Sequence, residues 1–216
     1  GLGVTQRTDR VRLQLRLANG RTRTRTLETV ERPIISKLPA PRGVTTPPFL
    51  ARVQESHWFE AWPDRETLYV QVNQIAPDED ETLPAFGLRL RQAIVQSGAR
   101  NVVLDLRHNN GGNTITYTEL LRTLVSFTTG GGKLYVLIGR NTYSAAANLS
   151  TDLERLADPV FIGEPTGDTG NQEGDEGMVR LPYSGLRATV SGVWWQLSHP
   201  WDHRRFIAPE APVQLT

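Results

Sequence analysis

The chain opens with a regular alternation of apolar and polar residues. Positions 11–17 (VRLQLRL) place their apolar side chains two residues apart, which is the period of a strand with one buried face. Asn19-Gly20 follows, and this dipeptide suits the positive φ angles of a tight hairpin turn. The return segment 21–30 alternates Arg with Thr, so its basic face is either a solvated strand edge or a contact for a polyanion or membrane surface. The pattern predicts an N-terminal β-hairpin.

The periodicity is lost between residues 31 and 48. This stretch is rich in proline, which is typical of a linker or of an extended wrapping segment. Its prolines are Pro33, Pro39, Pro41, Pro47 and Pro48. We therefore place a domain boundary here. Residues 1–48 are expected to be a hairpin and linker that end an upstream domain, and residues 49–216 to form a second domain.

The second part of the chain returns to clear patterns. Segments 58–62 and 68–75 flank a Pro63-Asp64 turn and predict a hairpin that leads into a core. Apolar positions in 84–97 recur at roughly helical spacing. Residues 101–106 (NVVLDL) form the nearly continuous apolar run of a parallel strand that is buried on both faces.

The same order of strand and helix is then repeated. Residues 114–127 predict a helix, 134–139 a buried strand, 144–156 a second helix and 159–164 a third buried strand. Alternation of this kind indicates βαβ units and a largely parallel sheet, so the fold class is α/β. The glycine-rich tail from Gly167 on is expected to form a loop followed by short strands.

Composition excludes several kinds of chemistry. The chain has no cysteine, so a cysteine nucleophile, a thiolate metal site and a disulfide are excluded. Its net charge of +1 draws it to neither nucleic acid nor an anionic membrane. No apolar run approaches the roughly 18 residues that span a bilayer. The start at Gly1 and the absence of a visible signal peptide lead us to expect an excised piece of a longer protein.

Two loops that follow buried strands carry the candidate chemistry. Residues 105–112 (DLRHNNGG) end in two glycines, whose N–H groups can face an anion because no Cβ blocks the approach. Residues 139–147 (GRNTYSAAA) place Ser144 at the start of a helix. Taken alone, the glycines fit a tight turn with nothing bound, and Ser144 fits a helix N-cap. However, both loops leave the carboxyl ends of strands, and these ends face one crevice in an α/β sheet.

Four motifs in these and later segments resemble the tail-specific (C-terminal-processing) serine protease family. They are VVLDLRHNNGG, YSAAA, GEPTG and the closing FIAPEAPV, which occur in the family's order over about residues 57–216. The resemblance implies a crotonase-like core and peptide hydrolysis. It also implies that Ser144 attacks the peptide carbonyl and that the backbone amides of Gly111, Gly112 and Ala145 hold the oxyanion.

The chain departs from the family at the base. Members with a Ser–Lys dyad carry a lysine a few residues after the Thr of the third motif, and here that stretch has none. The two lysines of the chain, Lys37 and Lys133, match no motif. A histidine-using variant of the family directs attention to Asp202 and His203, which are either an acid–base pair or a surface pair. Three further histidines, His57, His108 and His199, are weaker candidates.

Several alternatives remain open at this stage. The leading hypothesis is a serine peptidase that cuts an extended or unstructured polypeptide, and the alternative is a non-catalytic member that binds a peptide or an apolar ligand. A missing N-terminal part could also supply the base. The loop acids Asp168, Glu173, Asp175 and Glu176 either bind a cation or only solvate the loop. We expect no cofactor, no metal and no nucleic-acid partner. The resemblance alone implies a bacterial exported or envelope-associated protein.

Overall fold

The computed structural model describes residues 9–28 and 47–213. The chain forms two compact units, Gly1–Thr46 and Pro47–Thr216. In the first unit, β1 (Arg10–Arg16) and β2 (Thr22–Glu28) pair in antiparallel fashion around Gly20, whose φ is 79°, so the predicted hairpin is confirmed. Of the predicted linker, residues 31–48, the structure describes only residues 47 and 48.

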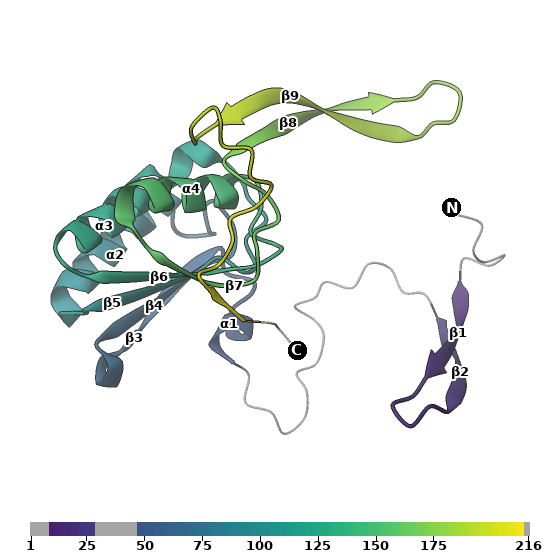
Figure 1. The fold of residues 1–216 in the computed structure, drawn as a ribbon, viewed down its shortest axis with the longest axis horizontal. Helices are drawn as coiled ribbons and strands as arrows, with labels where there is room; N and C mark the ends of the chain where they lie inside the picture. The colour runs from purple at the N-terminus through teal and green to yellow at the C-terminus, as the bar shows by residue number, and fades with distance from the viewer. Residues whose placement is uncertain (1–8, 29–46, 214–216) are drawn as a thin grey trace. The chain divides into compact units, whose positions relative to one another are not determined.

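A six-stranded sheet forms the centre of the second unit. Its order is β10-β7-β6-β5-β4-β3, and all neighbours are parallel except β3 and β4. The strands are β3 (His57–Trp62), β4 (Thr67–Val72), β5 (Asn101–Asp105), β6 (Lys133–Ile138), β7 (Val160–Gly163) and β10 (Ala211–Pro212). This mixed α/β arrangement confirms the predicted hairpin and the repeated βαβ units (Figure 1).

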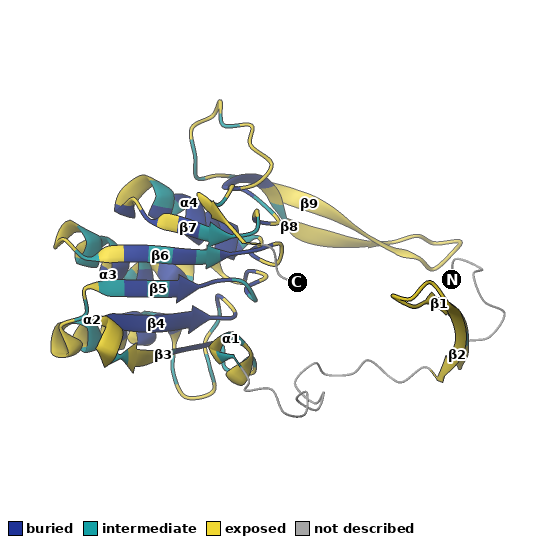
Figure 2. Cartoon of the chain, turned by 60° about the horizontal axis from the view of Figure 1, so that its bottom comes forward, coloured by how far each residue is buried: buried dark blue, intermediate teal, exposed yellow. Residues whose placement is uncertain are grey.

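Three long helices lie on one face of the sheet (Figures 1 and 2). They are α2 (Leu83–Ser97), α3 (Thr118–Thr129) and α4 (Ala145–Ala157), and a short 3-10 helix, η3 (Thr114–Tyr117), precedes α3. Alternate strand residues such as Val70, Leu104 and Val136 are fully buried beneath these helices and form the core. Burial of this apolar surface is the main force that holds the sheet and the helices together.

The opposite face of the sheet carries a polar network. There the Tyr69 hydroxyl donates to Asp105 Oδ2 at 2.6 Å, and Arg107 Nη2 donates to the same oxygen at 2.6 Å. Gln71 Nε2 donates to the backbone oxygen of Phe49, in the one-turn helix α1 (Pro48–Ala51), at 3.0 Å. Tyr69, Gln71 and Asp105 are buried and their polar groups are paired, and the bond from Gln71 attaches α1 to the carboxyl-terminal half of β4.

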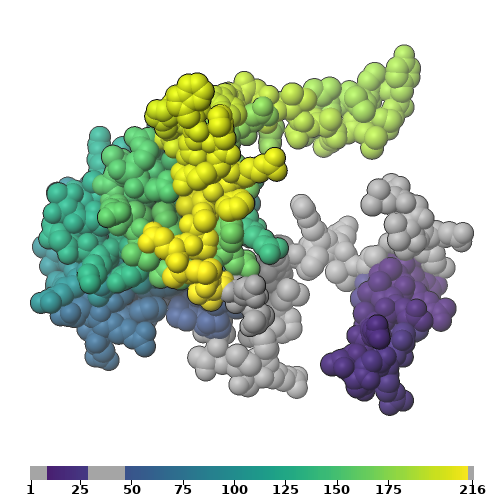
Figure 3. All heavy atoms as spheres, in the orientation of Figure 1, coloured from purple at the N-terminus to yellow at the C-terminus, as the bar shows by residue number. Residues whose placement is uncertain are grey.

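The tail differs from the prediction of a loop with short strands. It forms a long hairpin, here called the arm, whose strands β8 (Asn171–Arg180) and β9 (Arg187–Gln196) have ten residues each and extend away from the sheet (Figures 1 and 3). Every residue from Asp175 to Trp194 is exposed. The tail alternates apolar and polar residues in part, which predicted short strands, but because neither face of the ribbon is buried this pattern does not mark the full length of β8 and β9.

The last segment returns over the body of the second unit. Residues 197–213 pass across α4 and β7, where they are coloured yellow in Figure 3. Arg204 pairs with Glu154 of α4 at 2.8 Å, and Ile207 N donates to Thr166 Oγ1 at 2.7 Å. The closing motif and the GEPTG motif therefore lie against each other, although 41 residues separate Thr166 from Ile207.

Candidate active site

The loop between β6 and α4 is held rigidly by one buried threonine. Thr142 Oγ1 accepts a hydrogen bond from Gly139 N and donates one to Leu106 O, both at 3.0 Å. Its backbone N–H donates to Gly139 O at 2.8 Å, and its carbonyl accepts from Gly167 N at 3.0 Å. Thr142 thus joins the ends of β5 and β6 to the GEPTG segment. These bonds fix the backbone path of the residues that follow, Tyr143 and Ser144.

Ser144 has an unusual backbone conformation at the end of this loop. Its φ is 52° and its ψ is −125°, a region that costs a non-glycine residue on the order of 1–3 kcal/mol. Ser144 does occupy the N-cap position of α4, but its side chain accepts no hydrogen bond from the helix, so the capping interpretation is wrong. Strained strand-to-helix turns of this kind present the nucleophile in α/β-hydrolases, where they expose the hydroxyl.

The glycine turn after β5 lies directly against Ser144. A Cβ on Gly111 would lie 2.7 Å from Ser144 Cβ and 3.1 Å from Ser144 Oγ. A Cβ on Gly112 would lie 2.1 Å from the carbonyl oxygen of Ile75, with which Gly112 forms a β-bridge. Both residues also have positive φ angles, 111° and 140°. Only glycine allows this close approach. The prediction that the two loops share one edge of the sheet is confirmed, because β5 and β6 are adjacent and parallel.

A buried asparagine holds the glycine turn in place. Asn109 Nδ2 donates to Val72 O at 2.9 Å, and Asn109 Oδ1 accepts from Gly111 N at 3.0 Å. The carbonyl of Asn109 accepts from Tyr143 N at 3.1 Å. One residue therefore connects β4, the glycine turn and the serine loop.

The backbone amides around Ser144 are not equivalent. Gly111 N–H is already bonded to Asn109, and the N–H of Ser144 lies near the carboxylate of Asp168 and interacts with it electrostatically. Among the described residues, the N–H groups of Gly112 and Ala145 find no protein acceptor. Of the three amides predicted to hold an oxyanion, these two are free to do so in this arrangement.

A pocket of about 440 Å³ opens beside Ser144. Its walls come from the serine loop, the segment after β7 and the base of the arm. The lining residues are Tyr143, Ser144, Asp168, Glu173, Gly174, Asp175 and Glu176. Glu173, Asp175 and Glu176 are exposed, whereas Asp168 is partly buried, and burial raises the pKa of its carboxyl above the ordinary value. Within the described ranges, no group of three or more His, Asp or Glu side chains is arranged to hold a metal.

The residues predicted as acid or base lie outside this pocket. Asp202 accepts from Ser198 Oγ at 2.7 Å and from Arg204 Nη2 at 2.8 Å, and the Arg204 guanidinium holds the pKa of Asp202 well below its ordinary range. Such a stabilised carboxylate is a poor proton acceptor. His203 is exposed, and neither residue lines the pocket of Ser144. Their assignment as acid and base stays a prediction.

The remaining candidates are also outside the pocket lining. His57 is buried on the helix side of β3, where it packs against Phe86 with ring centroids 4.4 Å apart. Lys133 begins β6, whereas Ser144 follows the other end of that strand. His108 stacks on Phe49, and Lys37 lies outside the described residues. Sequence reasoning grouped Asp168 with the solvated loop acids, and no local signal set it apart.

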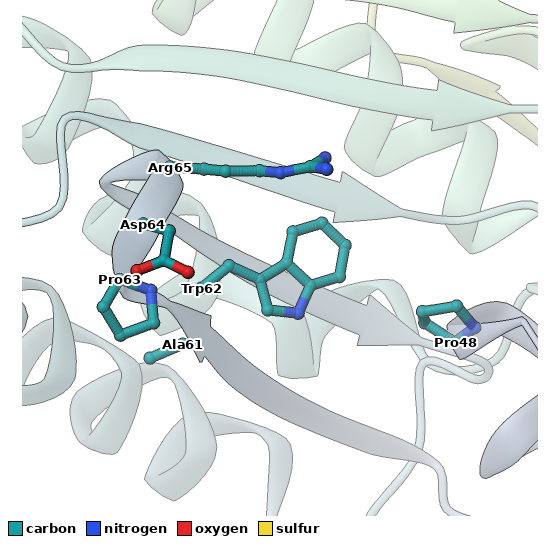
Figure 4. Close-up of a pocket in the computed structure, with 6 residues that line it drawn as sticks. All are labelled: Pro48, Ala61, Trp62, Pro63, Asp64 and Arg65. Atoms are coloured by element: carbon teal, nitrogen blue, oxygen red, sulfur yellow. The ribbon is translucent and has the colours of Figure 1, made fainter.

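A second pocket lies elsewhere, at the turn after β3. It measures about 570 Å³ and is lined by Pro48, Ala61, Trp62, Pro63, Asp64 and Arg65 (Figure 4). Figure 4 shows the Trp62 indole and the Arg65 guanidinium along its walls. Its lining contains no serine, threonine or histidine, so it lacks the side chains for nucleophilic catalysis. We therefore place the candidate active site at Ser144.

Comparison with known proteins gives support at the level of the fold. No family model and no curated protein sequence match the chain. The photosystem II D1 C-terminal processing protease superposes with a TM-score of 0.52 and 19% identity over 94% of this chain. CPAF bound to lactacystin gives 0.54 and 12% identity over 95% of this chain, and mature CPAF gives 0.52 and 12% over 94%. The chain spans only 55–63% of the length of these structures.

These likenesses extend the description of the fold. The chain has a mixed α/β fold, built on a sheet that is parallel except at one edge, and it is similar to the folds of these proteases. Identities of 12–19% show the arrangement of the elements and not the chemistry. Of the helices in the described parts of the chain, none has the length and apolar character needed to cross a membrane. The likeness to the protease structures supports a peptidase-like fold for the chain.

Proposed function

We propose that the chain is a serine-type peptidase with a crotonase-like core, in which Ser144 forms an acyl-enzyme with its substrate. The observation that carries this proposal is the strained Ser144 at a strand-to-helix turn, with Gly111 pressed against its side chain. A fold that maintains such strain does so against a cost of about 1–3 kcal/mol, and strain of this kind is concentrated at functional sites. The likeness to protease folds supports the same reading.

The surrounding groups fit the steps of acyl transfer. Ser144 Oγ would attack the carbonyl carbon of a peptide bond, and the negative charge that develops on the carbonyl oxygen would be stabilised by the N–H groups of Gly112 and Ala145. Ala145 is the first residue of α4, so the positive end of the helix dipole adds to this stabilisation. Gly111 would contribute space next to the nucleophile, because its own N–H is bonded to Asn109.

The substrate in this proposal is an extended or unstructured polypeptide. The pocket lies between the serine loop and the base of the arm, and its wall carries the carboxylates of Asp168, Glu173, Asp175 and Glu176. A polypeptide in extended form offers N–H groups that can donate to such carboxylates. The predicted binding of a substrate strand at a sheet edge remains compatible with the position of the pocket at the carboxyl ends of the strands.

Covalent labelling tests the role of Ser144. A fluorescent fluorophosphonate should label the wild-type chain at Ser144, as located by peptide mass spectrometry, and Ser144→Ala should lose both the label and any hydrolysis of fluorescein-labelled casein. Ser191→Ala, in the exposed part of the arm, is the matched control and should be labelled like the wild type. Labelling of Ser144→Ala at the wild-type rate would contradict the proposal.

The alternative function is non-catalytic binding of a peptide or an apolar ligand in the same pocket. It is favoured by one observation: neither a lysine nor a histidine lines the pocket that Ser144 lines. In that case Ser144→Ala would bind a peptide selected by the wild type with unchanged affinity. Neither protein would hydrolyse casein, and the fluorophosphonate would leave Ser144 unlabelled.

A further inference from the structure

Asp168 differs from the other carboxylates of the pocket in how it is held. Its Oδ1 accepts a hydrogen bond from Thr169 N at 2.9 Å, and its carboxylate lies close enough to the N–H of Ser144 for a favourable electrostatic interaction. Glu173, Asp175 and Glu176 are exposed and show no hydrogen bond or ion pair to a described residue. Asp168 is thus the one carboxylate of this pocket that contacts the nucleophilic residue itself.

The contact with the Ser144 N–H brings Asp168 close to the Ser144 hydroxyl. Within one serine, the backbone nitrogen and Oγ are separated by only three covalent bonds, so a group that binds the first is a near neighbour of the second. The Thr169 N–H holds the carboxylate, and Ser144 and Asp168 line the same pocket. In the proposed reaction, rotation of the Ser144 side chain about its Cα–Cβ bond would direct the hydroxyl proton to a carboxylate oxygen.

The surroundings of Asp168 make its carboxylate more basic. The Gln172 amide lies against it, the Tyr143 phenol interacts with it, and the carboxylates of Glu173, Asp175 and Glu176 line the same pocket, whose lining contains no cation. Burial raises the pKa of Asp168 above 3.8, although its interactions with the N–H groups of Thr169 and Ser144 oppose the rise. Asp202, by contrast, is fixed in its charged form by Arg204.

A row of side chains connects Asp168 to the start of η3, which follows the glycine turn. The Gln172 amide lies against the Asp168 carboxyl on one side and is bonded to Asn148 Oδ1 at 2.9 Å on the other. Asn148 Nδ2 in turn donates to Thr114 Oγ1 at 2.9 Å. Gln172 and Asn148 are 7% and 1% exposed, so the middle of the row is shielded from water.

We propose that Asp168 is the general base of this site, which takes the hydroxyl proton of Ser144 and returns it to the leaving group. This inference rests on the proposed function. In acylation, the Oγ–H proton passes to Asp168 as the Oγ–C bond forms and the carbonyl π electrons move to oxygen. The tetrahedral intermediate then collapses, the C–N bond breaks, and the amine leaves with the proton from Asp168.

Deacylation repeats the sequence with water. Asp168, charged again, takes a proton from a water molecule as the water oxygen bonds to the ester carbon. Collapse of the second intermediate breaks the C–Oγ bond, and Ser144 Oγ receives the proton back from Asp168. The acid product leaves, and both side chains regain their starting states, so no oxidant, metal or further reactant is needed.

A substitution at Asp168 tests this role directly. Asp168→Asn keeps an oxygen that can face the Ser144 N–H but removes the proton acceptor, and it should lower kcat/KM for fluorescein-labelled casein by about 10²–10⁴-fold. Asp80→Asn is the matched control, because it makes the same substitution at an exposed position outside the pocket. Asp80→Asn should retain activity within about threefold. Circular dichroism and the melting temperature would show that both variants are folded.

The pH profile and chemical rescue separate a base from a structural residue. The wild-type kcat/KM should fall on the acid side with an apparent pKa above 3.8, since only the charged carboxylate accepts a proton, and Asp168→Asn should lack this limb. Added formate should restore at least tenfold activity to Asp168→Ala, because formate can occupy the vacated space. A merely structural aspartate would respond to neither measurement.

The outcomes distinguish this inference from the proposed function. If Ser144→Ala abolishes hydrolysis while Asp168→Asn stays within about threefold of the wild type, the base lies elsewhere and the inference is overturned, but the peptidase proposal stands. If Ser144→Ala hydrolyses casein normally, the peptidase proposal is contradicted, and the inference on Asp168, which rests on it, is overturned as well. Loss of activity in Asp168→Asn with an unchanged acid limb and no rescue by formate would also overturn the assignment.

Discussion

Ser144 and Gly111 work as a pair, because neither residue can have its observed position without the other. The strained backbone of Ser144 turns its side chain toward the glycine turn, and the absence of a Cβ at Gly111 leaves room for it. Thr142 and Asn109 fix the two loops through buried hydrogen bonds, and these compensate for the strain. A side chain at position 111 is therefore a direct test of the geometry.

Gly111→Ala should lower labelling of Ser144 by a fluorophosphonate by at least about 10²-fold. The new Cβ would lie 2.7 Å from Ser144 Cβ, and alanine also strains the backbone at φ 111° by about 1–3 kcal/mol. Gly131→Ala is the control, because Gly131 has φ 90° but nothing within 4 Å of its Cβ position. It should lose similar stability in chemical denaturation and keep full labelling. Equal labelling of the two variants would contradict the proposed contact.

Buried His57 should make the stability of the fold depend on pH. Burial lowers its pKa below 6.5, although Glu81, 3.6 Å away, and Asp78 oppose the shift, and Arg89 adds to it. The unfolded chain therefore binds a proton at a pH where the folded chain does not, so stability falls as pH decreases through 6.5.

Replacing His57 by Gln should flatten this dependence. The melting temperature of the wild type should fall more steeply between pH 7 and pH 5 than that of His57→Gln, as measured by scanning calorimetry. The comparison concerns the slope, since the substitution also changes packing against Phe86. His203→Gln, at an exposed position, should keep the wild-type slope. Identical slopes in all three proteins would contradict the expectation.

Among single residues, the sequence identified those that their neighbours along the chain mark as functional candidates. Ser144 and the two glycines stand at the ends of apolar strands in segments of small residues, so their position could be predicted. The role of Asp168 could not, because its partial burial depends on a contact between distant segments, in which Gly167 N donates to Thr142 O. The engagement of Gly111 N–H by Asn109 is likewise invisible in a linear pattern.

At the scale of elements, prediction succeeded where burial imposes a period. The strands β5, β6 and β7 and the helices α2 and α4 agree with their predicted segments to within one or two residues. The length of the arm was missed because neither of its faces is buried, and because three glycines, Gly174, Gly177 and Gly192, interrupt its strands. Only its base is anchored, through Gln172 to Asn148 and Asn171 to the backbone of His199.

The outer half of the arm should therefore be the least stable part of the second unit. A two-stranded ribbon without a packed face is marginally stable in water. In hydrogen–deuterium exchange followed by mass spectrometry, amides of 177–187 should exchange at least about tenfold faster than those of β5, which lie at the centre of the sheet. Peptides covering 171–173 provide an internal comparison, since Asn171 and Gln172 are buried. Equal protection of 177–187 and β5 would contradict this view.

At the scale of the whole molecule, the hydrophobic core belongs to one unit. Every fully buried side chain among the described residues lies between His57 and Ile207, whereas no described residue of the first unit is buried. The parallel sheet and its three helices thus meet the usual requirement of a domain that folds alone.

Removal of residues 1–46 should accordingly leave the second unit folded. We expect the chain that begins at Pro47 to unfold within about 3 °C of the 216-residue chain, because the deleted described residues bury no apolar side chain. Leu104→Ala gives the scale of a true core defect, about 2–5 kcal/mol, since Leu104 is fully buried. Scanning calorimetry of the three proteins decides the matter. If the deletion lowers the melting temperature as much as Leu104→Ala does, the first unit contributes to the stability of the core after all.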